Sequence, residues 1–170
     1  MAIQFNINRQ KAIECVLWLI QRGETNMYSI WKMLFEAEKH SLNKYGYPVT
    51  GDTYIAMKYG TVPSWLYKLT NKWHPGIGFV KCGNSFIAER KPITDLLSEY
   101  DEKSLEHGYN EYSGLSFGAV KDKNHKEPAW IKNWEMREEG RESVPIPFED
   151  LVEEDWLRED LKLTSRTMVI

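Results

Sequence analysis

The amino-acid sequence predicts a mostly α-helical domain with one small β-hairpin. Segments with apolar residues at helical spacing, each introduced by a capping residue or proline, cover most of the 170 residues. One pair of short β-prone runs flanks a two-residue turn. An apolar content of 42% and a charged content of 28% are typical of a globular domain that can bury a core without disulfides.

The first two expected helices are neighbours in the sequence. Asn8 is the expected N-cap of a helix that ends at Gly23, with Ala12, Val16 and further apolar residues on one face. Asn26 is the expected N-cap of a longer helix, which ends near residues 46–48 at a glycine and a proline. The short break between them predicts a packed helical pair.

The following segment mixes turn signals with β-prone runs. Gly51 and Asp52 mark a turn before TYIAM, a short run of strand-like composition. Pro63 suits the first turn of a third helix over residues 63–73. GFVKC and SFIAE then flank Gly83 and Asn84, which predicts a hairpin. Three helices followed by a hairpin is also the order of a winged helix, and we keep that architecture as a hypothesis.

The C-terminal half is expected to be helical as well. Ser98 and Asp101 have the spacing of a capping box at the start of a helix through residue 112. Further helices are expected over residues 113–123 and 128–140, followed by a proline-marked linker, a last helix from residue 147 and a frayed end over residues 161–170. The expected organisation is a domain over residues 1–140 and an acidic extension over residues 141–170, with a short helix packed on the domain or on a partner.

The charge distribution argues against some functions. Residues 1–134 hold 17 basic and 14 acidic side chains, whereas residues 135–170 hold 5 basic and 11 acidic ones. This small positive excess gives little support to nucleic acid as a partner, although it does not exclude it. Two cysteines are too few for a disulfide framework. No apolar run could cross a membrane and no signal peptide precedes the first helix, so we expect a cytoplasmic protein.

No arrangement of residues specifies an active site. The four histidines lack metal-binding spacing and no glycine loop suits a phosphate, so neither metal nor cofactor is expected. Asp52 is either a general base or a carboxylate that accepts backbone N–H groups at its turn, and we favour the second interpretation. His125 lacks an identifiable catalytic partner, and we favour a hydrogen bond to backbone at a helix entry.

Residues 41–73, SLNKYGYPVTGDTYIAMKYGTVPSWLYKLTNKW, combine many aromatic side chains with backbone-breaking residues. Tyr54, Tyr59, Trp65 and Tyr67 have two interpretations: core residues with satisfied polar atoms, or an exposed patch of binding anchors. Interleaved lysines would also suit RNA or single strands, but neighbouring acidic residues and the low net charge argue against that.

Within this stretch, LNKYGYPVTGDTYIAMKYGTVPSWLYKL resembles the signature of the Panacea domain, the family of SocA-like antitoxins. Leu34, Glu36 and Ala37 match its preceding helix, and NHKEPAW at residues 124–130 is similar to its downstream His-Trp segment. Thr61 replaces a proline of the family pattern, and Asn124 replaces a threonine. The residues that the resemblance marks as a structural motif are Gly51, Asp52, Gly60 and Pro63.

The resemblance implies a bacterial or prophage protein of a toxin–antitoxin system, which neutralises a cognate toxin encoded beside it by direct protein–protein binding. Neither a catalytic residue nor a cofactor is needed for that, so a non-enzymatic protein is expected. The candidate toxin-binding residues are Tyr54, Lys58, Tyr59, Trp65, His125 and Trp130.

Three other functions stay open from the sequence. The resemblance also allows an adaptor that delivers the toxin to a cellular protease, which a disordered C-terminal end would suit. The winged-helix order allows a DNA-binding autoregulator. Asp52 and His125 would be the residues of an enzyme that reverses the toxin's modification.

Overall fold

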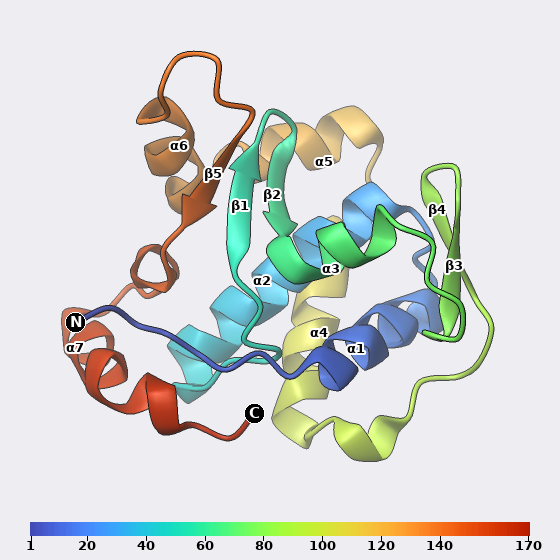
Figure 1. Cartoon of the computed structure of the whole chain (residues 1–170), viewed down its shortest axis with the longest axis horizontal. Coiled ribbons are helices and arrows are strands. Elements are labelled where there is room, and N and C mark those ends of the chain that lie inside the picture. Colours follow the sequence, from blue (N-terminus) through green and yellow to red (C-terminus); the bar gives the residue numbers. More distant parts are fainter.

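Helix α2 (Met27–Tyr45) is the central element of the computed structural model, which describes all 170 residues. Helices α1 (Arg9–Arg22) and α4 (Glu99–Tyr112) pack beside it (Figure 1). Gly108 allows the close approach of α4, because a Cβ atom there would overlap the carbonyl oxygen of Met33. The expected helical pair is therefore present, with a third helix against it.

The caps that the sequence indicates are formed. The Asn8 side chain accepts a hydrogen bond from the backbone N–H of Lys11, and Asn26 caps α2 in the same way. Gly46 ends α2 in the left-handed conformation, with φ of 68°. Ser98 and Asp101 form both hydrogen bonds of the capping box at α4. These local signals place four helix boundaries correctly.

The β-structure is more extensive than the single predicted hairpin. β3 (Phe79–Cys82) and β4 (Ser85–Ala88) form that hairpin, but β1 (Tyr54–Met57), β2 (Gly60–Pro63) and β5 (Ser143–Ile146) form a second sheet. β1 is its central strand and is antiparallel to both neighbours. Because β1 and β2 come between α2 and α3, they interrupt the helix order expected of a winged helix. We call residues 54–63 the motif hairpin.

The segment around Pro145 is β5, not the predicted linker. Pro145 lies opposite Ile55 of β1. β5 has no partner on its other side, and an edge strand tolerates a residue that cannot donate a backbone hydrogen bond. The pairing depends on a partner almost ninety residues earlier in the chain, which explains why local patterns did not indicate it.

The remaining helices are short. They are α3 (Ser64–Thr70), α5 (Phe117–Asn124), α6 (Pro128–Glu135) and α7 (Asp155–Thr164), with 3-10 turns at Thr94–Leu96, Phe148–Leu151 and Ser165–Thr167. The helix predicted over residues 128–140 thus ends five residues early, because the chain leaves α6 to reach the edge of β1. A single helix was predicted from residue 147, but the chain forms the 3-10 turn Phe148–Leu151 first and then α7.

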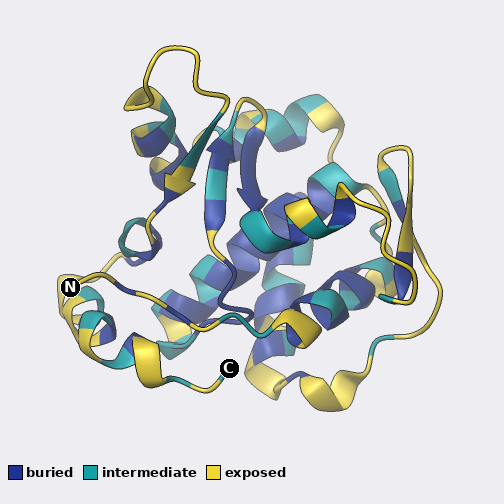
Figure 2. Cartoon of the chain, viewed as in Figure 1, coloured by how far each residue is buried: buried dark blue, intermediate teal, exposed yellow.

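Two apolar clusters form the core, and Figure 2 shows buried residues concentrated along α2 and on the motif hairpin. The first cluster joins α1, α2 and α4 to the β3–β4 hairpin and includes Cys15, which is fully buried as expected. The second joins α2 and β1 to the C-terminal elements. Its members are Ile3, Phe5, Phe35, Leu42, Tyr54, Ala56, Ala129, Trp130, Ile146, Phe148, Leu151, Val152, Leu157 and Leu161.

The C-terminal end is packed, so the prediction of a frayed end is wrong. The Ser165 hydroxyl is buried and accepts a hydrogen bond from the backbone of Gln4 at 3.0 Å. The Asn8 side chain donates to the carbonyl oxygen of Ile170 at 2.6 Å. Both chain ends thereby meet near Gly51, at the start of the motif hairpin.

No helix in the structure combines the length and the apolar character that crossing a membrane requires.

Candidate functional site

The turn of the motif hairpin carries two exposed side chains, Lys58 and Tyr59, and the Tyr59 side chain is 47% exposed. Gly60 follows with φ of 121°, a conformation that disfavours any residue with a side chain. A Cβ atom at this position would overlap Asn124 Oδ1 and would lie 2.9 Å from Lys32 Cε. Gly60 therefore lets α5 and α2 pack directly against the backbone of the turn.

The junction between α5 and α6 holds the same turn in place. Trp130 Nε1 donates to the carbonyl oxygen of Met57 at 2.8 Å, and His125 Nε2 lies 2.9 Å from the carbonyl oxygen of Lys58. The indole and imidazole rings stack with centroids 3.9 Å apart and planes 8° apart. Asn124 Oδ1 accepts the backbone N–H of Thr61 at 2.7 Å. This junction thus fixes or closely packs four of the five backbone positions from Met57 to Thr61, all except Tyr59.

His125 has the structural role that we favoured. Its Nε2 faces a carbonyl oxygen and must therefore carry the proton, so this nitrogen is not free to act as a base. Burial lowers the pKa of His125, which favours the neutral ring, with the nearby cations Lys121 and Lys32 acting in the same direction.

Asp52 also serves the backbone. Its Oδ1 accepts the N–H of Trp65 at 3.0 Å and its Oδ2 accepts the N–H of Leu66 at 3.2 Å. These are free donors in the first turn of α3, whose N-cap residue, Pro63, has no side-chain acceptor. Asp52 is therefore a cap supplied from outside the helix. Burial raises its pKa to about 6 despite these hydrogen bonds.

Glu38 is a motif-supporting residue that our sequence reasoning missed. Its buried carboxylate accepts the N–H groups of Val49 at 2.7 Å, Thr50 at 3.0 Å and Gly51 at 2.8 Å. Burial raises its pKa to about 7. The spacing of four residues from Leu34 places Glu38 on the apolar face of α2, and that placement was the signal that could have revealed it.

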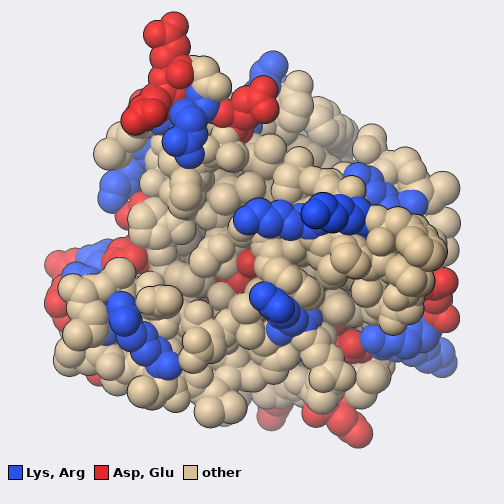
Figure 3. All heavy atoms as spheres, viewed as in Figure 1, with Lys and Arg blue, Asp and Glu red and all other residues tan.

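A pocket of about 540 Å³ opens beside the motif hairpin, and we call it the hairpin pocket. α2 and the hairpin form two of its sides, and the loop between α6 and β5 forms another. The lining residues are Met27, Tyr28, Trp31, Lys32, Met57, Lys58, Tyr59, Val62, Tyr67, Trp134, Arg137, Gly140, Arg141 and Glu142. Figure 3 shows acidic side chains gathered over that loop and basic ones over α3.

Two of the residues that line the hairpin pocket carry buried donors without a hydrogen-bond partner, Trp31 Nε1 and Lys32 Nζ. The Lys32 side chain is fully buried, and its Nζ lies 4.0 Å from the ring centroid of Tyr28. Burial lowers the pKa of Lys32 to about 7. Tyr28 in turn donates its hydroxyl hydrogen to the carbonyl oxygen of Tyr59 in the exposed turn.

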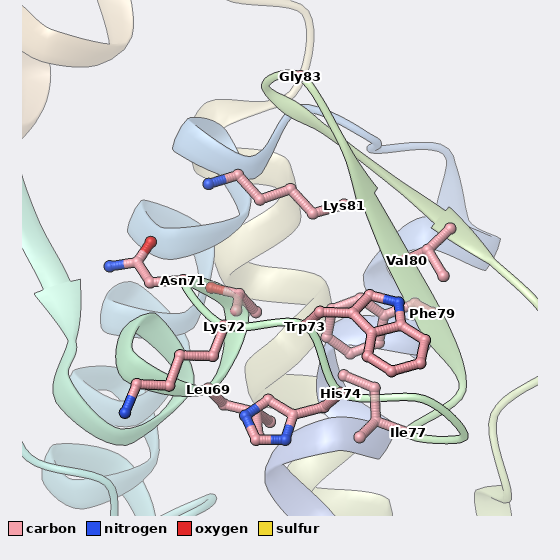
Figure 4. A pocket seen from close by; sticks show the side chains of 11 residues that line it. Leu69, Asn71, Lys72, Trp73, His74, Ile77, Phe79, Val80, Lys81 and Gly83 are labelled. Atoms are coloured by element: carbon pink, nitrogen blue, oxygen red, sulfur yellow. The ribbon is translucent and has the colours of Figure 1, made fainter.

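A second pocket of about 440 Å³ lies between the end of α3 and β3. Figure 4 shows Lys72, Trp73 and His74 around it, with Lys81 opposite. Trp73 is 82% exposed. This pocket contains no residue of the motif hairpin and no buried polar side chain without a partner.

The structure separates the candidate toxin-binding residues. Lys58 and Tyr59 are exposed at the turn, and His125 and Trp130 support that turn from beneath. Tyr54 does not lie on the surface: it is 2% exposed and its hydroxyl donates to the carbonyl oxygen of Leu34, so it occupies the core position that was the alternative. Trp65 is half-buried on α3, with the Arg9 guanidinium 5.5 Å from its ring.

The structure contains no group of three or more His, Cys, Asp or Glu side chains that could hold a metal ion.

Comparison with known families gives one match. The family model described as antitoxin SocA-like, Panacea domain, matches residues 30–131. This range includes most of α2, the motif hairpin and the α5–α6 junction with His125 and Trp130. No curated protein and no solved structure matches the chain.

Proposed function

Because the chain belongs to the SocA-like antitoxin family with a Panacea domain, we propose that it neutralises a cognate toxin, encoded beside it, by binding that toxin directly. The observation that carries this proposal is the exposed turn of the motif hairpin, which is held rigidly and stands beside an open pocket. Lys58 and Tyr59 are the proposed contact residues at the turn.

Rigidity supports a binding role for this surface. The carbonyl oxygens of Met57 and Lys58 are hydrogen-bonded by Trp130 and His125, and the turn packs tightly at Gly60. A surface that is ordered before binding loses less conformational entropy when the partner arrives, so more of the contact energy contributes to affinity. Tyrosine and tryptophan are also over-represented among the side chains that dominate interface energetics.

The roles of Asp52 and His125 support a non-enzymatic function. Asp52 uses both carboxylate oxygens on the N-terminus of α3, and His125 uses Nε2 on the hairpin backbone. Both side chains therefore have structural tasks at the positions where an enzyme that reverses toxin damage would need free groups. The packed C-terminal end likewise removes the observation that favoured a protease adaptor.

We also propose that residues 141–170 act together with the domain over residues 1–140, as support for the binding surface. β5 pairs along the whole of β1, and α7 contributes Leu157 and Leu161 to the second core cluster. The acidic extension is thereby connected to the strand that leads into the exposed turn.

The test is co-purification with the product of the adjacent gene, combined with a growth rescue assay. The double variant Lys58→Glu/Tyr59→Ala is compared with wild type and with Trp73→Ala, a matched control that removes an exposed aromatic side chain outside the hairpin pocket. We expect the double variant to lose both complex and rescue, and Trp73→Ala to keep both. A typical interface of about 1,600 Å² extends well beyond two residues, but loss of its anchors dominates the affinity.

Two results would contradict the proposal. Rescue by wild type without a complex, together with a shortened toxin lifetime in cells, would indicate delivery to a protease. A complex that both variants form equally well would place the interface outside the motif hairpin.

A further inference from the structure

We propose that the hairpin pocket recognises a carboxylate: the toxin inserts an aspartate or glutamate side chain, together with a neighbouring apolar residue, so that the carboxylate meets Trp31 Nε1 and Lys32 Nζ. This inference rests on the proposed function and names the chemistry of the partner's anchor.

Two residues that border the hairpin pocket carry buried donors without a hydrogen-bond partner. Trp31 Nε1 and Lys32 Nζ are the only buried side-chain nitrogen or oxygen atoms in the chain that lack a hydrogen-bond partner. Native proteins pair nearly all such groups, because each unpaired one costs free energy of folding. Adjacent in sequence, both residues border the same pocket. One carboxylate, with two acceptor oxygens and a negative charge, would satisfy both.

Basic side chains outnumber acidic ones among the residues that line the hairpin pocket. Lys58, Arg137 and Arg141 are exposed there, and none of them forms an ion pair with an acidic side chain. Arg137 lies over the Trp134 ring, with its guanidinium carbon 3.8 Å from the centroid. Glu142 is the only acidic residue of the lining. Within the lining, basic side chains therefore outnumber the one acidic side chain, which favours an anionic group inside the pocket.

The walls of the hairpin pocket are largely apolar. Met27, Met57, Val62 and Trp134 give the pocket an apolar lining beside its two polar donors. A free phosphate would leave these walls uncovered, whereas an acidic residue beside an apolar one fills both parts. In a protein partner, aspartate and glutamate are the side chains that carry an anion at neutral pH.

The energetics favour such an anchor. A buried ion pair is usually weak because both charges must leave water when it forms. Here Lys32 has already left water on folding, so that part of the cost belongs to the free antitoxin and not to the complex. Only the incoming carboxylate loses hydration on binding. Its negative charge favours the protonated form of the desolvated Lys32 amine, so the carboxylate gains a cation and an indole N–H.

The test measures the affinity of the toxin for the full-length chain carrying Lys32→Met. Methionine keeps a flexible apolar chain of similar length and removes the charge, so the variant is expected to fold at least as stably as wild type. Loss of the cation would leave the toxin's carboxylate buried and unpaired, which predicts an increase in Kd of at least about 30-fold. Lys126→Met, at an exposed lysine outside the pocket, is the control and should leave Kd unchanged.

The carboxylate itself is identified by replacing each aspartate and glutamate of the toxin in turn with its amide. One replacement should weaken binding to wild type strongly and weaken binding to Lys32→Met far less, because the two changes remove the same contact. Tight binding of toxin by wild type and Lys32→Met alike would overturn this inference and leave the proposed function standing. No binding of toxin by wild type would overturn the proposed function, and this inference with it.

Discussion

Replacement of Lys32 by methionine should make the free protein more stable. Lys32 is fully buried, has no hydrogen-bond partner and lies in no ion pair. Burial lowers its pKa from 10.5 to about 7, so the folded protein disfavours the charged form that the unfolded chain prefers. Each unit of pKa difference corresponds to about 1.4 kcal/mol of folding free energy. The wild-type chain is therefore destabilised at every pH at which the unfolded chain holds this proton, that is, below about 10.5.

The gain in stability expected for Lys32→Met depends on pH, because the penalty from Lys32 is complete below pH 7 and disappears toward pH 10.5. Below pH 7 both states are protonated and the full penalty of about 5 kcal/mol applies. Between pH 7 and 10.5 only the unfolded state holds the proton, so the penalty from Lys32 shrinks by about 1.4 kcal/mol per pH unit. At pH 7.5 about 4 kcal/mol of the penalty is left. The contact of Lys32 with the Tyr28 ring offsets up to about 2 kcal/mol, so we expect a net gain of about 2–4 kcal/mol for Lys32→Met.

The assay is urea unfolding followed by tryptophan fluorescence at pH 6, 7.5, 9 and 10, with both proteins at each pH. The difference in unfolding free energy should be largest at pH 6 and should shrink steadily toward pH 10. Lys126→Met removes an exposed lysine and should shift stability by less than about 0.5 kcal/mol at every pH. A difference that does not change with pH, or a less stable Lys32→Met at pH 6, would refute the burial argument.

Three further changes test the support of the motif hairpin. Gly60→Ala should lower the free energy of unfolding in urea by about 2–4 kcal/mol, because the new Cβ atom would overlap Asn124. Gly83→Ala is the control: it has open space around its Cβ atom and should lower the free energy of unfolding by about 1 kcal/mol. Equal losses in the two variants would contradict the close packing at Gly60. Asp52→Ala should lower stability by about 1–2 kcal/mol because the cap of α3 is lost. Asp52→Asn keeps one acceptor oxygen and should lower stability by less. No loss of stability in Asp52→Ala would show that the cap is dispensable. Burial and a hydrogen bond to a neighbouring carboxyl raise the pKa of Glu36, so the contribution of Glu36 to stability should fall as pH rises above 4.5. Wild type should therefore lose stability relative to Glu36→Gln as pH rises; a constant difference between the two proteins in urea unfolding would argue against a retained proton.

Local chemistry made much of the fold predictable. The caps at Asn8, Asn26 and Ser98 and the glycine at position 46 act within a few residues, so the sequence reveals them directly. The β3–β4 hairpin depends on its own two-residue turn and was equally visible. The interpretation of Asp52 as an acceptor of backbone N–H groups was correct because aspartate in a turn commonly has that role. Its donors, however, belong to α3 and not to its own turn.

The features missed by sequence reasoning depend on distant partners. β5 contains a proline and has no local turn, and only its pairing with β1 makes it a strand. Lys32 resembles an ordinary solvent-facing lysine, and it is buried because the backbone of Gly60 packs on its side chain. The aromatic residues of the motif could not be divided into core and surface without the structure, which buries Tyr54 and exposes Tyr59.

The position of β5 also has a consequence during synthesis. Until residue 146 has left the ribosome, the motif hairpin has a free strand edge, and the contact between the carbonyl oxygen of Ile170 and Asn8 forms later still. Contacts across such long sequence separations form late in folding. A truncated or unfinished chain would therefore present a hairpin without its closing strand, and in a gene pair the order and rate of translation would set the time at which a competent antitoxin first meets its toxin.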